Sequence, residues 1–274
     1  MKGEKEKIQA DIEAFDTQEG QKLSFMKRFF PEIAAGWDWV QEHQSEFEKE
    51  VFGPAMITCS LKDERYSDQI QALLQNGDFG CFTAQTAADH KKLSHQLYKV
   101  MSLSVDIRTC VRPLESFEPP TTREEAARMG LDGFAIDFLD GPKPVLAMLC
   151  AEKGLQRSGV ALAEHTDAQY ESLVQSGISQ WSAGKQSYIV RRRKEYGPQA
   201  MTTVAKHIQP GKFWTSQPVD TQEKTALEHR LREVSEQWDA MKEEHKALQA
   251  RKQGIEEKQK EAEDKVVSVD PYHS

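Results

Sequence analysis

The stretch TQEKTALEHRLREVSEQWDAMKEEHKALQARKQGIEEKQKEAEDKVV, residues 221–267, decides the C-terminal part of the fold. Residues that can occupy the contact positions between two coiled-coil helices, most of them apolar, recur in it at steps of four and three. They are Leu227, Leu231, Val234, Trp238, Met241, His245, Leu248, Ile255, Ala262 and Val266. Glu, Lys, Arg and Gln fill most other positions, so a lone helix would leave its apolar stripe in water. The heptad pattern therefore predicts a coiled-coil arm over 218–267, followed by a short tail over 268–274.

The other end of the chain is the candidate partner for this helix. Residues 1–50 carry a similar spacing, at Ile8, Ile12 and Phe15 and then at Leu23, Met26, Phe30, Ile33, Trp37 and Val40. Within this arm, the spacing up to Phe15 and the spacing from Leu23 onward are out of phase by one residue near Glu19. Pro31 is predicted to bend the helix because proline removes a helical hydrogen-bond donor. We expect the two arms to pair antiparallel within the chain, and pairing between chains remains open.

Composition bounds the class of protein. The chain has 274 residues and a net charge of −8, and its N-terminus, Met1-Lys2-Gly3-Glu4, does not resemble a signal peptide. It holds no apolar run long enough to span a membrane. Cys59, Cys81, Cys110 and Cys150 lie far apart in apolar stretches, which favours buried free thiols over zinc ligands or disulfides.

Between the arms, residues 51–217 predict a globular α/β (α+β) domain with mixed sheets. Strand and helix patterns alternate in two halves, about 51–113 and 121–217, joined by a connector around Pro119-Pro120. Thr86, Thr122 and Thr166 are predicted helix N-caps. The predicted strands are 54–61, 79–84, 105–111, 134–139 and 160–163, followed by three successive strands at 187–194, 200–208 and 212–216.

Signatures of enzymes are missing from the sequence. It contains no GxxxxGK(S/T) phosphate loop, no HExxH, no GxSxG and no glycine-rich dinucleotide turn. Asp132, Asp137 and Asp140 could suggest a magnesium site, but turn geometry already explains the two that lie in Asp-Gly pairs. We therefore expect no catalytic residues, no metal and no cofactor.

One basic segment stands out in this acidic chain. Residues 185–214 carry a net charge of +6, which leaves −14 for the rest. The candidate nucleic-acid-binding residues are Lys185, Arg191, Arg192, Arg193, Lys194, Lys206, Lys212 and Trp214. Concentrated Lys and Arg can neutralise phosphates, and the interleaved aromatic residues can stack on unpaired bases. Because strand residues alternate, Arg191 and Arg193 are predicted on one face and Arg192 and Lys194 on the other.

Two other interpretations of the basic segment remain open. Lys and Arg protect exposed edge strands from aggregation, so the charge could be purely structural. The basic strand could also dock an acidic surface of a partner protein without contacting DNA. Tyr196, beside the Gly197-Pro198 turn, could pack inside, anchor a partner or stack on a base.

Several strings of the chain resemble the hinge of SMC (structural maintenance of chromosomes) proteins, in particular the fifth eukaryotic SMC subfamily, which pairs with the sixth. The strings are Trp39-Val40 through Phe47, Phe52 through Thr58, Leu61-Lys62-Asp63, Gly141 through Cys150, and Tyr188-Ile189-Val190. The resemblance runs from about Gly36 into the second arm. A globular region between two arms that fold back on each other is also typical of this family.

The resemblance implies two subdomains in a pseudo-symmetric arrangement and heterodimerisation with the sister SMC hinge. It also implies DNA binding near the junction of hinge and arm, preferentially to single strands, and a nuclear, chromosome-associated role in DNA repair and recombination. The family's ATPase heads lie at the far ends of longer arms, so we expect an excised, non-enzymatic piece. Arg193 and Tyr196 match a segment that the subfamily places near its partner interface.

Overall fold

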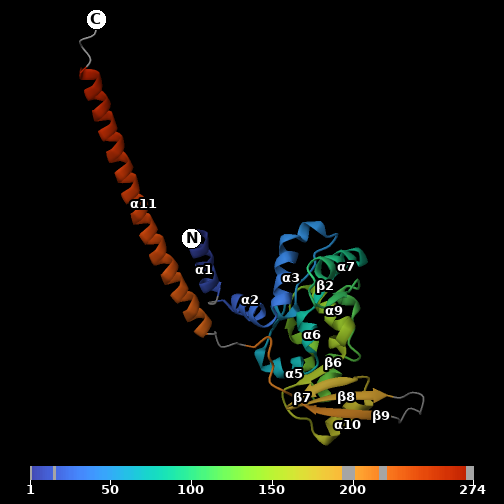
Figure 1. The fold of residues 1–274 in the computed structure, drawn as a ribbon. Helices are drawn as coiled ribbons and strands as arrows, with labels where there is room; N and C mark the ends of the chain where they lie inside the picture. Colours follow the sequence, from blue (N-terminus) through green and yellow to red (C-terminus); the bar gives the residue numbers. More distant parts are fainter. Residues whose placement is uncertain (1, 15–16, 193–200, 216–220, 270–274) are drawn as a thin grey trace. The chain divides into compact units, whose positions relative to one another are not determined.

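The computed structural model describes residues 2–14, 17–192, 201–215 and 221–269, which form two compact units (Figure 1). One unit comprises Met1–Gln21 with Pro218–Ser274, and the other comprises Lys22–Gln217. Each unit is described by itself below.

The first unit holds two whole helices, α1 (Lys2–Ala14) and α11 (Thr221–Val269), and the first residues of α2, up to Gln21. They run in opposite directions (Figure 1), and Lys5 Nζ donates to Ser235 Oγ at 2.9 Å. Ile8 and Val234 are buried in this unit, each 6% exposed. The predicted contact between the two ends of the chain is therefore present along α1.

The outer part of α11 differs from the expectation of a continuously paired arm. Met241, Leu248 and Ile255 belong to the predicted seam, yet they are exposed at 45%, 58% and 51%. Helix α1 has 13 residues against 49 in α11, so it is too short to cover them. Among the described residues, no other helix of this unit is available to cover the outer seam.

From Lys22 onward, the predicted N-terminal arm belongs to the globular unit. Helix α2 (Gln18–Phe29) ends before Pro31, which is the first residue of α3 (Pro31–Glu42). Met26 and Val40 are fully buried there because they pack into the globular core rather than along a partner helix. Pro31 interrupts the helix as predicted, since proline is well tolerated at the first helical position and poorly inside.

The first half of the globular unit is built from short elements around a two-stranded parallel sheet, β2–β3. In chain order these elements are η1 (Gln44–Glu46), α4 (Ala55–Thr58), β1 (Ser60–Leu61), η2 (Glu64–Tyr66), α5 (Ser67–Gln71), α6 (Asn76–Gly80), β2 (Phe82–Ala84), α7 (Ala87–Ser94), the π-helix η3 (His95–Val100) and β3 (Ile107–Thr109).

The second half carries a five-stranded mixed sheet in the order β4-β6-β7-β8-β9. Its elements are η4 (Leu114–Ser116), α8 (Arg123–Arg128), β4 (Gly133–Phe134), η5 (Ala135–Phe138), β5 (Leu139–Asp140), α9 (Lys143–Lys153), η6 (Leu155–Arg157), β6 (Ser158–Ala161), α10 (Asp167–Gln175), β7 (Gln180–Ala183), β8 (Gln186–Arg192) and β9 (Met201–His207). The antiparallel pair β1–β5 joins the two halves.

Four strand predictions are wrong in whole or in part, and one of them is 134–139, where the 3-10 helix η5 occupies Ala135–Phe138 between two short strands. Most of 54–61 is occupied by helix α4, and Phe79-Gly80 closes α6 rather than opening a strand. Residues 212–216 form no strand over their described part, 212–215, and strand β7 was not predicted. Short apolar runs have no clear period, so a buried helical turn and a buried strand look alike in sequence.

The predicted helix caps are confirmed. The side chains of Thr86, Thr122 and Thr166 accept hydrogen bonds from the backbone N–H of the residue three positions later, at 3.1, 3.2 and 3.3 Å. Gly154 ends α9 in the left-handed region with φ of 65°. A side chain at this position would be strained, because few residues other than glycine adopt that conformation.

Helix α9 forms the centre of the larger core. Its residues Val145 to Cys150 are all buried, and they pack with side chains from both halves, among them Met56, Ile70 and Leu155. All four cysteines are buried free thiols. Burial raises the pKa of Cys59, Cys81 and Cys150 to about 12, so these thiols stay protonated and unreactive. No described helix is both long and apolar enough to cross a membrane.

A buried ionic cluster fastens β3 and α9 to α6. The Asp78 side chain is fully buried and contacts Arg108 Nη1 at 2.5 Å and Lys153 Nζ at 3.3 Å. The same carboxylate accepts a hydrogen bond from the backbone N–H of Gln75 at 2.6 Å. Both carboxylate oxygens are therefore engaged, which compensates for the cost of removing the charge from water.

We expect Asp78→Ala to lower the free energy of unfolding by about 3 kcal/mol, because Arg108 and Lys153 would keep their charges without a counter-ion. Chemical denaturation measures this loss. The matched control is Glu115→Ala, which removes the exposed ion pair of Glu115 with Lys143 at 2.6 Å and should leave stability near that of the parent protein. Equal losses in the two variants would contradict a special role for the buried cluster.

Candidate nucleic-acid interface

Strands β8 and β9 carry the basic segment, and their register sorts its side chains into two faces. The strands are antiparallel, with Ser187 opposite Lys206, Ile189 opposite Val204, and Arg191 opposite Thr202. Directly opposed residues project to the same side of a sheet. These three pairs therefore share one face, which we call the outer face, and Tyr188, Val190 and Arg192 occupy the inner face.

The inner face belongs to a small hydrophobic core under α10. Tyr188 stacks on Trp181 with ring centroids 5.1 Å apart, and Val190 is 4% exposed. Burial raises the pKa of the Tyr188 phenol, and the neighbouring Tyr170 and Glu164 raise it further. Tyr188 is thus a core residue.

Arg192 also has a structural role on this face. Its Nη2 donates to the carbonyl oxygens of Val174 at 2.9 Å and Ile178 at 3.2 Å, and to that of Ser176. These carbonyls lie at and just beyond the C-terminal end of α10, where helical carbonyls have no partner within the helix. The guanidinium of Arg192 is consequently occupied, and we remove Arg192 from the candidate contacts.

The outer face presents its cations to solvent. Arg191 and Lys206 are exposed, and Ile189 between them is 37% exposed. Thr202 and Lys206 are four residues apart on β9, which places Arg191 and Lys206 about 13 Å apart along the ladder. No Asp or Glu occurs in 180–192 or 201–215, so these cations have no acidic neighbour within the described part of their own strands and loops.

Lys185 lies in the turn between β7 and β8 and is also exposed. The turn depends on Gly184, whose φ is 52° and whose Cβ, if it had one, would overlap the Glu164 side chain. This tight turn fixes where β8 begins and therefore which residues of the strand face outward. Arg193, Lys194 and Tyr196 fall in 193–200, outside the described residues.

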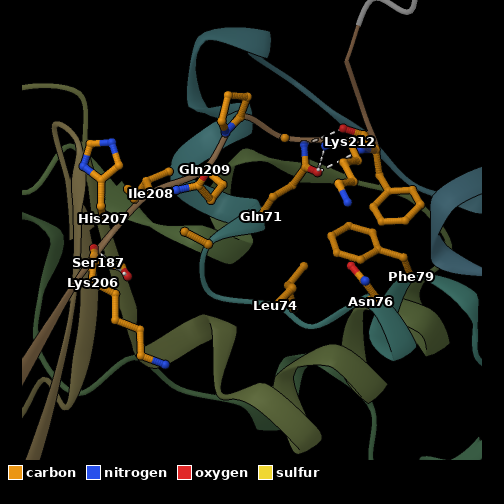
Figure 2. Close-up of a pocket in the computed structure, with 14 residues that line it drawn as sticks. Gln71, Leu74, Asn76, Phe79, Ser187, Lys206, His207, Ile208, Gln209 and Lys212 are labelled. Atoms are coloured by element: carbon orange, nitrogen blue, oxygen red, sulfur yellow. Dashed lines mark hydrogen bonds between the residues drawn. The ribbon is translucent and has the colours of Figure 1, made fainter.

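A pocket of about 250 Å³ lies where the chain leaves β9 (Figure 2). Leu74 and Phe79 contribute apolar surface, and Asn76, Ser187 and Gln209 contribute polar groups. Two predicted site residues, Lys206 from β9 and Lys212 from the following loop, both line this pocket (Figure 2). Two cations that are six residues apart in sequence thus line the same pocket, from different sides.

Gln71 of α5 fixes the loop that forms one wall of the pocket. Its Oε1 accepts hydrogen bonds from the backbone N–H groups of Lys212 and Phe213, each at 2.9 Å, and its Nε2 donates to the carbonyl of Phe213 (Figure 2). Asp68 Oδ1 accepts from the N–H of Gly211 at 2.7 Å. A Cβ at Gly211 would overlap the Gln71 amide, so the close approach requires glycine.

The same loop carries Trp214 into the core. Trp214 is 5% exposed, its Nε1 donates to the Ala55 carbonyl at 2.9 Å, and its ring meets Phe79 edge to face at 4.8 Å. Phe213 stacks on Phe79 at 4.3 Å. These aromatic rings are not available to bases, so we also remove Trp214 from the candidate contacts.

Two of the three aspartates that suggested a metal site have local roles. Asp137 pairs with Arg123 at 2.6 Å and accepts from the N–H of Phe134 at 3.1 Å, and Asp132 accepts from the N–H of Leu162 at 2.8 Å. Within the described residues, no group of three or more His, Cys, Asp or Glu side chains is arranged to hold a metal ion.

Comparison with known proteins places this geometry in a family context. No family model matches the chain. It is 24% identical over 260 residues to structural maintenance of chromosomes protein 5 of Schizosaccharomyces pombe, an alignment that covers 88% of this chain and 24% of that protein. The chain thus spans about a quarter of the length of that curated relative.

A solved structure matches nearly the whole chain. The crystal structure of the S. pombe Smc5/6 hinge domain superposes with a TM-score of 0.69 at 22% identity, and covers 96% of this chain and 98% of that one. The chain therefore has the fold of an SMC hinge domain with adjoining helical segments, and in sequence it is similar to the SMC5 protein of S. pombe.

Proposed function

We propose that this hinge pairs with the hinge of the sister SMC protein, the sixth, and binds DNA beside that junction in a nuclear, chromosome-associated repair complex. The match to a structure titled as the Smc5/6 hinge domain supports the pairing. Strands β3 and β9 end their sheets within the described part of the chain, and edge strands can accept a strand from another chain. Tyr196 and Arg193 stay in this proposal as partner-facing residues on sequence grounds.

The uncovered outer face of β8 and β9 carries the DNA part of the proposal. Arg191 and Lys206 project to one side without acidic neighbours on their strands, and Lys185 and Lys212 extend the positive surface at the turn and the pocket. Arg193 and Lys194 remain candidate contacts because they continue the basic run. At about 13 Å apart, Arg191 and Lys206 can contact separate phosphates of one strand.

Preference for single-stranded DNA depends on the segment after β8. Trp214 and Phe213 are buried and Tyr188 faces the core, so Tyr196 is the remaining aromatic candidate within the basic segment for stacking on a base. Replacing it should therefore reduce any difference in affinity between single and double strands more than it reduces binding overall.

We expect the double variant Arg191→Ala and Lys206→Ala to weaken binding of a single-stranded oligonucleotide by at least about tenfold. The dependence of log affinity on log salt should also become shallower, by about 0.7 for each lost phosphate contact. Fluorescence anisotropy over a salt series measures both quantities. An unchanged salt dependence would contradict phosphate binding by this face.

Arg192→Ala is the matched control for that experiment, because it removes the adjacent arginine from the opposite face. It should lower the free energy of unfolding by about 2 kcal/mol through the loss of hydrogen bonds to three carbonyls. DNA affinity measured well below the unfolding transition should stay within about twofold of the parent protein. The reverse pattern would support the purely structural interpretation of the outer face.

Light scattering tests the pairing. A mixture of this chain with the hinge of the sixth SMC protein should show the mass of one copy of each, and the outer-face double variant should assemble equally well. If the double variant fails to assemble while DNA affinity is unaffected, the basic face docks a protein surface instead of DNA. If the mixture shows no mass increase, the heterodimer proposal is wrong.

A further inference from the structure

The pocket where the chain leaves β9 is a recess with walls from both halves of the globular unit. Leu74 and Asn76 come from the first half, and Ser187 and Lys206 come from β8 and β9 of the second. Its volume of about 250 Å³ lies just below the roughly 300–1,000 Å³ typical of pockets for drug-sized ligands. The space therefore suits a single planar ring system rather than a larger ligand.

Part of the pocket wall is apolar. Leu74, Phe79, Ile208 and Phe213 line it, and each is 9% exposed or less, so each presents only a small part of its surface. Burial of apolar surface is favourable, whereas a fully hydrated ion gains nothing from such a wall. The pocket therefore favours a ligand that has an apolar face.

Two side-chain amides supply the hydrogen-bonding groups of the pocket. Asn76 and Gln209 both line it and are exposed, and within the described residues neither side chain makes a hydrogen bond. Each amide donates through its nitrogen and accepts through its oxygen. The edge of a nucleobase also carries both donors and acceptors, so a base can satisfy both groups of an amide.

The charge of the pocket is positive on two sides. Lys206 lies on one side and Lys212 on another (Figure 2), and no Asp or Glu is among the lining residues of the described chain. Two carboxylates contact its neighbours without lining it, since Asp68 accepts from the N–H of Gly211 and Asp106 lies beside Gly77. A nucleotide within a strand matches this pattern, because it has a phosphate on each side of its base.

Lys206 connects the pocket to the outer face of β8 and β9. Lys206 and Ser187 lie opposite each other on that face, and both also line the pocket. The Lys206 ammonium makes no ion pair or hydrogen bond within the described part of the chain, so its charge is available to a ligand. A strand that lies along the outer face from Arg191 therefore reaches the pocket at Lys206.

We propose that this pocket holds one unpaired base of a bound DNA strand, an inference that rests on the DNA binding proposed above. Lys206 and Lys212 bind the phosphates on either side of that nucleotide, and Asn76 and Gln209 hydrogen-bond the edge of its base. A base in a duplex has this edge occupied by its complement and leaves the stack only at a cost, so the pocket favours single strands. A carboxylate of an acidic peptide fits less well, because it only accepts hydrogen bonds.

A short oligothymidine strand and a strand of equal length without bases test the proposal by fluorescence anisotropy. We expect the parent protein to bind the strand with bases about tenfold more tightly, and the double variant Asn76→Ala and Gln209→Ala to reduce this difference to about twofold. The salt dependence should stay that of the parent protein, because no cation is lost. Any contribution of Tyr196 to the difference is common to both proteins, so the loss in the variant belongs to the pocket.

Ser187→Leu tests the space itself, and Thr202→Leu is its matched control. Both residues lie on the outer face of the same ladder, but only Ser187 lines the pocket. Ser187→Leu should reduce the difference between the two strands to about twofold, and Thr202→Leu should leave it unchanged. A difference that all these variants retain would overturn the proposed base site.

The two DNA proposals fail in distinguishable ways. If the parent protein binds both strands equally and with a steep salt dependence, the pocket holds no base, and phosphate binding by the outer face stands. If neither strand binds, DNA binding and the base site are both wrong. Displacement of the strand by a short acidic peptide, with the amide variant binding the strand with bases as tightly as the parent protein does, would identify the pocket as a carboxylate site instead.

Discussion

The side-chain amide of Gln71 is the contact on which the architecture after β9 depends. It binds the backbone of Lys212 and Phe213, and its Nε2 also donates to Ser67 Oγ at 2.6 Å. One side chain from the first half of the globular unit thereby holds the loop that leaves the last strand of the second half. With the loop held, Phe213 and Trp214 enter the core around Phe79, and the pocket beside Lys206 acquires its wall.

Side chains alternate between the two faces of the sheet along β8, and this alternation separates the residues that pack in the core from the candidate DNA contacts. Arg191 and Arg192 are adjacent and chemically identical, yet one faces solvent and the other caps the end of α10. The difference is set by which neighbours fill the inner core, Tyr188 and Val190, because a shift of one residue would bury Arg191 and expose both apolar side chains. A charge run in sequence therefore overestimates the number of cations that one ligand can contact.

Local signals in the sequence were sufficient for the helix caps, the stop at Gly154, the break at Pro31, and strands β8 and β9, because each depends on neighbouring residues alone. The strand predicted over 54–61 failed because Ala55, Met56 and Cys59 are buried without a clear sequence period, and a helical turn can bury such a short run as well as a strand can. Trp214 failed for a similar reason. Aromatic residues among lysines suggest stacking on bases, but Trp214 has φ of 47° and turns inward to Ala55, a contact 159 residues away in sequence.

Helix α11 shows how far a heptad pattern extends beyond the partner that the described chain supplies. At 1.5 Å per residue, its 49 residues span about 74 Å, whereas the 13 residues of α1 span about 20 Å. Met241, Leu248 and Ile255 repeat every seven residues on the uncovered part, and burying such side chains is worth about 1.5–3 kcal/mol each. Within the described part of the chain, the seam that begins with Ile8 and Val234 is thus uncovered beyond the end of α1.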